Sequence, residues 1–136
     1  MKPAIFLLLC ALCFSLPSAR AQEPARLNKK NLVIKEWNTD VKTKARILDH
    51  QTIYSPEGKK IEETEYGNSG QKWRKRYEYG ADGRVSRELL YDEHNRLNTV
   101  KKFEYNEFGR KKTQYTYDAK GKLKTIKVFE YVTEDA

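Results

Sequence analysis

Apolar or aromatic residues alternate with charged residues along most of the chain after residue 50. Counting backward in twos from Tyr105 gives Phe103, Lys101 and Thr99, while charged residues such as Lys102 occupy the intervening positions. A period of two with one polar face predicts half-buried antiparallel strands. A helix fits poorly, because turn signals arrive about every dozen residues. The many β-branched and aromatic side chains also favour strands.

Six tyrosines each begin a short turn signature. Ser, Asp, Asn or Gly follows the tyrosine, where a short polar side chain can hydrogen-bond the turn backbone. Gly or Asn stands three residues further on, where a positive φ is tolerated. The residues at this last position are Gly58, Gly70, Gly83, Asn95, Gly109 and Gly121. Six signatures in phase predict six turns that connect the strands.

The repeating unit is longer than one strand. Residues 80–105 align with residues 106–131, and both segments end in Phe-Glu-Tyr, with an offset of 131 − 105 = 26 residues. The unit is therefore predicted to be a two-strand hairpin. Equivalent residues of successive hairpins should lie two strands apart at the same height, which predicts tyrosine ladders on one face. The ladder positions are Tyr66, Tyr79, Tyr91, Tyr105, Tyr117 and Tyr131.

These patterns predict an all-β protein, an antiparallel meander of about seven or eight strands made of repeated β-hairpins. The repeats occupy residues 54–131, and residues 132–136 form a C-terminal tail. Residues 22–53 are expected to cap the sheet, with a strand over 32–37, a turn over 38–40 and a long or bulged strand over 41–54. Residues 22–30 and 133–136 are expected to be loose. The sheet is either a curled single layer or barrel-like.

The first 21 residues have the order of a secretory signal peptide. Lys2 precedes an apolar run over residues 4–16, and small residues lead up to Ala21. A membrane anchor is the alternative, but a span needs about 20 apolar residues and Pro17 ends the run earlier. We predict cleavage after Ala21, and a secreted or periplasmic protein with no stable membrane span afterwards. Both cysteines lie in this segment, so the mature chain would have no thiol chemistry.

The chain is basic, with 27 Lys and Arg against 19 Asp and Glu and a formal net charge of +8. Nearly every strand-like segment carries both signs, which suits a solvated surface better than a groove for a polyanion. Basic residues interleaved with aromatic residues can bind single-stranded nucleic acid. The export signal and the interspersed glutamates argue against it, so no nucleic-acid partner is expected.

The residues offer little for catalysis. His50 and His94 are the histidines that could act as bases near neutral pH, and they stand in unrelated contexts. The sequence has no serine in a nucleophile-elbow context, no Gly-rich phosphate loop and no cluster with metal-ligand spacing. We therefore predict a protein that is not an enzyme and has no cofactor or metal site. A carboxylate pair from separate strands is the alternative that the sequence leaves open.

The turn signature is clearest over residues 117–123, Tyr-Asp-Ala-Lys-Gly-Lys-Leu, followed by an aromatic strand that ends in Glu130-Tyr131. Over about residues 54–131 the chain resembles the YD repeat of Rhs-type bacterial surface and toxin proteins. Gly67 and Gly80 depart from the Asp position of that motif, and Asn95 departs from its Gly position. In the family, the repeats form β-hairpin arrays that enclose a toxin or mediate contacts. The resemblance implies a short stand-alone array, with no toxin domain and too few repeats for a closed shell.

The predicted function is a non-enzymatic module of the bacterial envelope with a structural or protein-interaction role, because repeat sheets leave edge strands available for pairing. Self-association through a face or an edge of the sheet belongs to this expectation. The alternative is a module that binds glycans or anionic envelope polymers by aromatic stacking and basic side chains. Its candidate residues, expected on the tyrosine-bearing face, are Trp73, Lys75, Tyr77, Lys101, Lys111, Tyr115 and Lys127.

Overall fold

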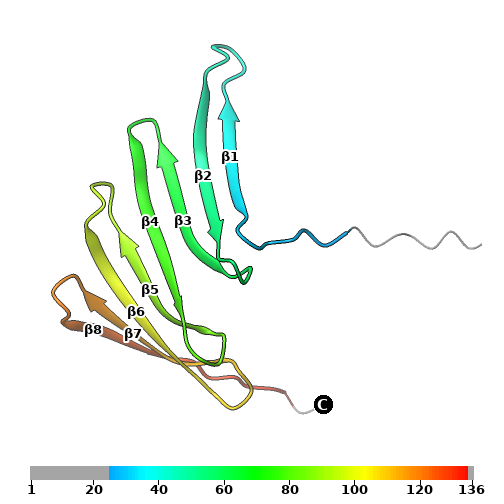
Figure 1. Cartoon of the computed structure of the whole chain (residues 1–136). Coiled ribbons are helices and arrows are strands. Elements are labelled where there is room, and N and C mark those ends of the chain that lie inside the picture. The colour runs from blue at the N-terminus through cyan, green and yellow to red at the C-terminus, as the bar shows by residue number, and fades with distance from the viewer. Residues whose placement is uncertain (1–24, 135–136) are drawn as a thin grey trace, which may run out of the picture.

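The protein forms one antiparallel sheet of eight strands, in which each strand pairs with its neighbours along the chain (Figure 1). This computed structural model describes residues 25–134, so the expected signal peptide, residues 1–21, lies outside the described residues. The strands are β1 (Val33–Thr39), β2 (Arg46–Tyr54), β3 (Lys60–Gly67), β4 (Gly70–Tyr79), β5 (Val85–Tyr91), β6 (Leu97–Tyr105), β7 (Lys111–Asp118) and β8 (Leu123–Val128). The predicted all-β meander is confirmed.

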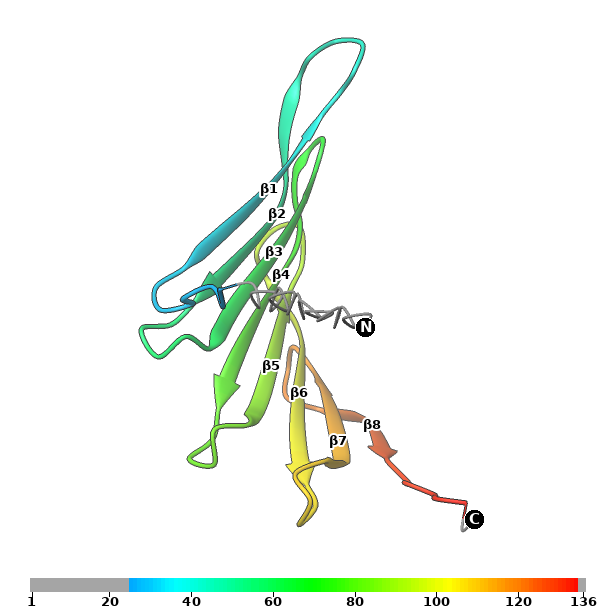
Figure 2. The same ribbon diagram turned by 90° about the vertical axis from the view of Figure 1, so that its right-hand side faces the viewer.

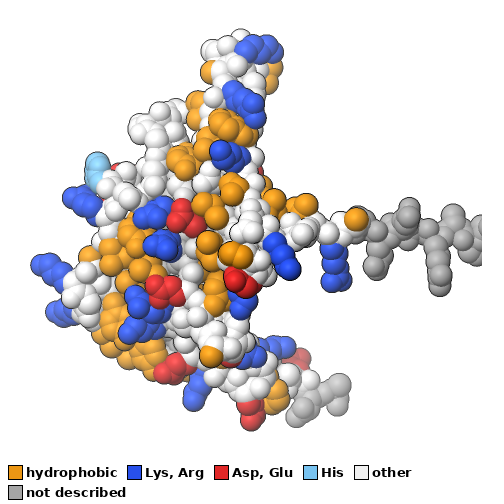
Figure 3. Space-filling view, viewed as in Figure 1, with side chains coloured by type: hydrophobic (Ala, Val, Ile, Leu, Met, Phe, Trp, Pro, Cys, Tyr) orange, Lys and Arg blue, Asp and Glu red, His pale blue; other side chains and the backbone are white. Residues whose placement is uncertain are grey.

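The sheet is open, and the barrel-like alternative is wrong. Within residues 25–134, β1 and β8 each pair with one strand and not with each other. Figure 2 shows a single twisted layer whose twist carries β1 and β8 apart. Both faces stay in solvent, and no hydrophobic residue of the described segment is buried. Apolar side chains and Lys or Arg side chains are interspersed over the face seen in Figure 3.

Five of the six turns share one hydrogen-bonded geometry, which explains their sequence signature. In the Asp92 turn, the backbone N–H of Asn95 donates to the carbonyl of Asp92 at 3.0 Å, and Asn95 has φ of 60°. The Asp92 carboxylate also accepts the backbone N–H groups of His94 and Arg96, both at 2.9 Å. These backbone bonds, that of Arg96 above all, hold the pKa of Asp92 below its ordinary value.

Two connections differ from the predictions. Between β3 and β4, Gly67 pairs directly with Gly70, so this hairpin has a two-residue loop instead of the longer turn of the other repeats. Between β1 and β2, the expected long strand over residues 41–54 begins only at Arg46. The preceding residues form a turn, because the Asp40 carboxylate accepts the backbone N–H groups of Lys42 and Thr43 at 2.9 and 2.6 Å.

The expectation that all tyrosine ladders lie on one face is wrong. Residues directly opposite each other on paired strands share a face. Tyr79 shares a face with Val85, and Glu78 shares the other face with Arg87. Ser86 is therefore an extra, bulged residue that reverses the alternation. Each of the seven strand pairs has one such register shift. We call the two faces the Trp73 face, which also carries Tyr79, and the Tyr91 face.

The tyrosines are divided evenly between the ladders on the two faces. Tyr79, Tyr105 and Tyr131 belong to the Trp73 face, and their hydroxyls donate to the carbonyls of Lys60, Val85 and Lys111 at 2.6, 2.7 and 2.7 Å. A basic residue lies over each ring, at 5.0 to 5.7 Å from the ring centre, and comes from the neighbouring turn at the same end of the sheet. The register places Tyr66, Tyr91 and Tyr117 on the Tyr91 face.

Residues 22–30 were expected to be loose, but residues 28–30 are held in place, and residues 22–24 lie outside the described residues. The backbone N–H of Asn31 donates to the carbonyl of Ser55 at 3.0 Å, and the Lys30 N–H donates to the Asn28 side chain at 3.1 Å. Lys29 lies against Gly58 and places its ammonium 5.5 Å from the centre of the Tyr54 ring. Residues 28–31 therefore attach to the β2–β3 turn and continue the array of basic residues over tyrosines.

Candidate functional site

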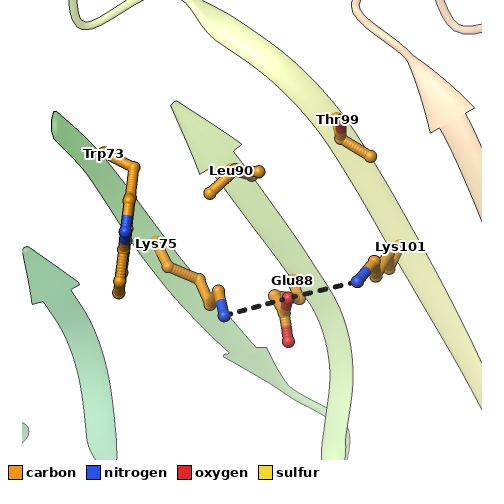
Figure 4. Close-up of a pocket in the computed structure, with 6 residues that line it drawn as sticks. All are labelled: Trp73, Lys75, Glu88, Leu90, Thr99 and Lys101. Carbon is orange, nitrogen blue, oxygen red and sulfur yellow. Dashed lines mark ion pairs between the residues drawn. The ribbon is translucent and has the colours of Figure 1, made fainter. Parts of the chain in front are cut away.

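A hollow on the Trp73 face spans β4, β5 and β6. It has a volume of about 280 Å³ and an open mouth, and Figure 4 shows how its side chains converge from the three strands. Trp73 and Leu90 supply apolar surface, while charged groups lie along one side. The six lining residues, which we call the Trp73 hollow, are Trp73, Lys75, Glu88, Leu90, Thr99 and Lys101.

A shared carboxylate organises the charges of the Trp73 hollow. The Glu88 Oε1 atom lies 3.6 Å from the Lys75 ammonium and 3.9 Å from the Lys101 ammonium (Figure 4). The Lys75 ammonium also lies 5.3 Å from the centre of the Trp73 ring. Two cations on one carboxylate leave one net positive charge beside an aromatic surface. This arrangement suits a ligand that combines a flat apolar ring or sugar face with an acidic group.

A second group of paired charges lies beside the hollow, toward β2 and β3. The Glu63 carboxylate accepts hydrogen bonds from the Lys60 ammonium at 2.7 Å and from the Tyr77 hydroxyl at 2.5 Å. Burial by itself raises the pKa of Glu63, but these two hydrogen bonds and the positive charges of Lys60 and Lys75 together outweigh it and lower the pKa. Burial raises the pKa of Tyr77 far above its ordinary value, and the bond to Glu63 raises it further.

The raised pKa of Tyr77 makes the stability of the fold sensitive to alkali. An unfolded tyrosine ionises near pH 10, whereas folded Tyr77 stays neutral, so its contribution is fully present below about pH 10 and is lost progressively as the pH rises further. We expect the free energy of unfolding to fall between about pH 9 and pH 11.5, and Tyr77→Phe to reduce that slope. Urea titrations at each pH measure the free energy of unfolding of the wild type and the variant. Tyr66→Phe is the control, since its hydroxyl forms no hydrogen bond within residues 25–134, and an equal reduction there would contradict the assignment.

The structure gathers only part of the set predicted to bind a ligand. Trp73, Lys75 and Lys101 line the Trp73 hollow, and Tyr77 lies beside it. Lys111 and Lys127 are on the same face but on β7 and β8, where their ammonium groups lie over the rings of Phe103 and Phe129 at 4.2 and 6.0 Å.

Tyr115 lies on the Tyr91 face, so the expectation that it shares a face with Trp73 is wrong. It is opposite Lys102, and its hydroxyl donates to Glu104 at 3.3 Å. The sequence reasoning also missed Glu88, Leu90 and Thr99. Glu88 was expected on the face opposite Trp73, because the bulge at Ser86, which places Tyr91 and Tyr79 on different faces, was not visible in the pattern.

The two edge strands carry a second kind of exposed surface. On β1, Val33 and Trp37 are exposed. On β8, Leu123 and Ile126 are exposed, and the side chain of Val128 is 67% exposed. By register these five side chains belong to the Tyr91 face. Edge strands with apolar side chains and unpaired backbone groups readily pair with another strand.

A metal site, a histidine site and a membrane-spanning helix are further features of the described residues that could indicate a function. No group of three or more His, Cys, Asp or Glu side chains in residues 25–134 is placed to hold a metal ion. The Nδ1 atom of His50 is hydrogen-bonded to the Glu65 carboxylate at 2.9 Å, and its ring lies edge-on to Trp73, while His94 is in the exposed Asp92 turn. This part of the chain also has no helix with the length and apolar character of a membrane span.

Comparisons with known proteins add little to this description. No family model matches the chain, and no curated protein matches it. Among solved structures, the crystal structure of TarM is similar over 70% of this chain, with 18% sequence identity and a TM-score of 0.35. The match covers 21% of the TarM chain, so this protein spans about a fifth of it. The resemblance to YD repeats remains a prediction.

Proposed function

We propose that the protein is exported to the bacterial envelope, where it acts as a non-enzymatic interaction module that binds another protein chain. The observation that carries the proposal is the open sheet, in which no hydrophobic residue between residues 25 and 134 is buried. Burial of apolar surface is the main favourable contribution to protein association. A sheet with two solvated faces and two free edges gains that contribution when a partner covers it.

The arrangement of exposed side chains supports the same proposal. The apolar residues of β1 and β8 lie at the two edges, where the backbone can also pair with a partner strand. In the middle of the sheet, by contrast, Lys, Arg and Glu side chains pair with one another and cover the strands with their aliphatic stems. Binding through the edges would bury apolar surface without breaking these ion pairs.

Cross-linking in intact producing cells tests the proposal. We expect the exported protein, identified by an N-terminus at Gln22, to be recovered in a cross-linked complex of fixed stoichiometry with a protein, which is either another copy or a second chain. The control is the same protein cross-linked after denaturation. Recovery of single, uncomplexed chains alone would overturn the proposal. Recovery of the chain with its first 21 residues attached would overturn the export step.

The Trp73 hollow supports a second candidate function, the binding of an acidic glycan. Its aromatic surface and its two lysines on one glutamate match the chemistry of a charged sugar. Glycan arrays probed with the purified protein and with the Trp73→Ala, Tyr77→Ala double variant distinguish the candidates. Binding that is lost in the double variant would favour the glycan function, whereas signals that the double variant retains would exclude the hollow as their site.

A further inference from the structure

We propose that β8 of one chain pairs with β1 of a second copy, so that chains join head to tail into a longer continuous sheet. The inference rests on the proposed interaction function and names its partner. Within the described residues, β1 and β8 are the two strands with one neighbour each. Because the meander has eight strands, β8 runs antiparallel to β1 of a copy placed after it, as each strand does to the next within one chain.

The backbone groups at the two edges are compatible with this pairing. Phe129 donates its N–H to the carbonyl of Lys112 on β7, so the N–H and C=O groups of Val128 point away from the sheet. On β1, the Leu32 carbonyl accepts the N–H of Tyr54, so the backbone groups of Val33 and Lys35 point away from β2. The outward-pointing residues of both edges belong to the Tyr91 face, as continuous pairing requires.

One register also matches the side chains of the two edges. It places Lys127 opposite Glu36 on the Trp73 face, and both are exposed with no ion pair within residues 25–134. Opposite charges directly across two strands stabilise the pairing. The same register brings apolar residues together on both faces. Its other pairs are Ile126 with Trp37, Val128 with Lys35, and Phe129 with Ile34.

The internal repeat supports continuation of the sheet beyond β8. The offset of 26 residues makes Ile126 the equivalent of Val100, which is half-buried in β6 and lies opposite Tyr117 of β7. Ile126 has no such strand beyond it within the described chain and is 56% exposed. The outer edge of β8 thus has the sequence of an internal strand, whereas terminal repeats of soluble arrays usually have a polar outer side. A head-to-tail contact leaves the second edge of each copy free for another copy, so it would give assemblies of more than two chains.

Sedimentation and light scattering of the exported, purified protein test the inference. We expect the average mass to rise with concentration beyond that of two chains. The Val128→Pro variant should have the mass of a single chain at every concentration. Proline removes the outward-pointing N–H group at this position but no hydrogen bond to β7. Val128→Ala, which keeps the N–H, should still associate. Circular dichroism and thermal unfolding establish that both variants are folded. A wild-type protein that stays monomeric, or association that Val128→Pro leaves unchanged, would overturn the inference.

Charge reversal tests the register. Lys127→Glu and Glu36→Lys should each weaken association about tenfold, because each places like charges opposite each other, and the double variant should recover to within about threefold of the wild type. The matched control is Lys42→Glu, the same charge change in the exposed β1–β2 turn, with less than a twofold expected effect. Failure of the double variant to recover would overturn the proposed register.

The outcomes separate this inference from the function on which it rests. Association that stops at two chains would indicate a closed contact and overturn the head-to-tail arrangement. A protein that is monomeric when purified but cross-links to a different chain in cells would overturn the inference and leave the interaction function standing. A protein that is monomeric when purified and forms no cross-linked complex in cells would overturn both the inference and the interaction function.

Discussion

Replacing Tyr105 with alanine is expected to lower the free energy of unfolding by about 2–3 kcal/mol. Tyr105 is half-buried, its hydroxyl donates to the Val85 carbonyl at 2.7 Å, and the Arg84 guanidinium lies 5.7 Å from the centre of its ring. Alanine removes the aromatic contact area, the hydrogen bond and the cation–π contact together. Urea denaturation followed by circular dichroism measures the change.

Tyr131→Ala is the matched control for this prediction. Tyr131 makes the same two contacts, a hydrogen bond to the Lys111 carbonyl at 2.7 Å and a ring 5.5 Å from the Arg110 guanidinium. It belongs to the last repeat and is 48% exposed, so its loss should cost about 1 kcal/mol. Equal costs at the two positions would contradict the idea that neighbouring repeats supply most of the stabilisation.

The single-layer sheet has no buried apolar core within residues 25–134 that could stabilise it. The most buried side chain described is Thr64, at 3% exposure, and it lies beneath longer side chains of the Tyr91 face. Stability must come from contacts between adjacent hairpins, in which tyrosines, basic residues and turns repeat at each step. Repeat proteins gain stability from such nearest-neighbour interfaces, so the interior units should contribute more than the last one.

The meander and its turns could be predicted from the sequence, because local chemistry determines them. Asp92 and Asn95 form their turn through hydrogen bonds within five residues, and the same residue types recur at the same spacing. The assignment of residues to faces could not be predicted. It depends on the bulges at Ser86, Asn98 and Lys112, each of which reverses the alternation without a distinctive residue type.

The same limit affected the candidate site. Trp73, Lys75 and Lys101 could be placed together, since counting in twos from Tyr79 and from Tyr105 reaches the same face. Glu88, the carboxylate that joins the two lysines, was missed because Tyr91, from which its face was counted, was expected on the face of Tyr79. The bulge at Ser86 places these two tyrosines on different faces. The signal that could have found it is charge pairing, since Glu88 is directly opposite Lys101 on β6 and diagonal to Lys75 on β4, as expected for cross-strand ion pairs.

Gly121→Val is expected to lower the free energy of unfolding by about 2 kcal/mol through backbone strain. Gly121 ends the β7–β8 turn with φ of 82°, a conformation that β-branched residues rarely adopt. An added Cβ atom would meet no other atom within 4 Å, so the cost arises from the backbone and not from a steric clash with a neighbour. Thermal and urea unfolding of the variant measure the loss.

Ala119→Val controls for the added valine itself. Ala119 lies in the same exposed turn but is not among the residues with positive φ, so this change should alter stability by less than about 0.5 kcal/mol. Asn95→Gly tests the same idea in the opposite direction. Asn95 has φ of 60°, and glycine at this position should leave stability within about 1 kcal/mol of the wild type. If Gly121→Val cost no more than Ala119→Val, the turn would not require the left-handed conformation that its sequence signature indicates.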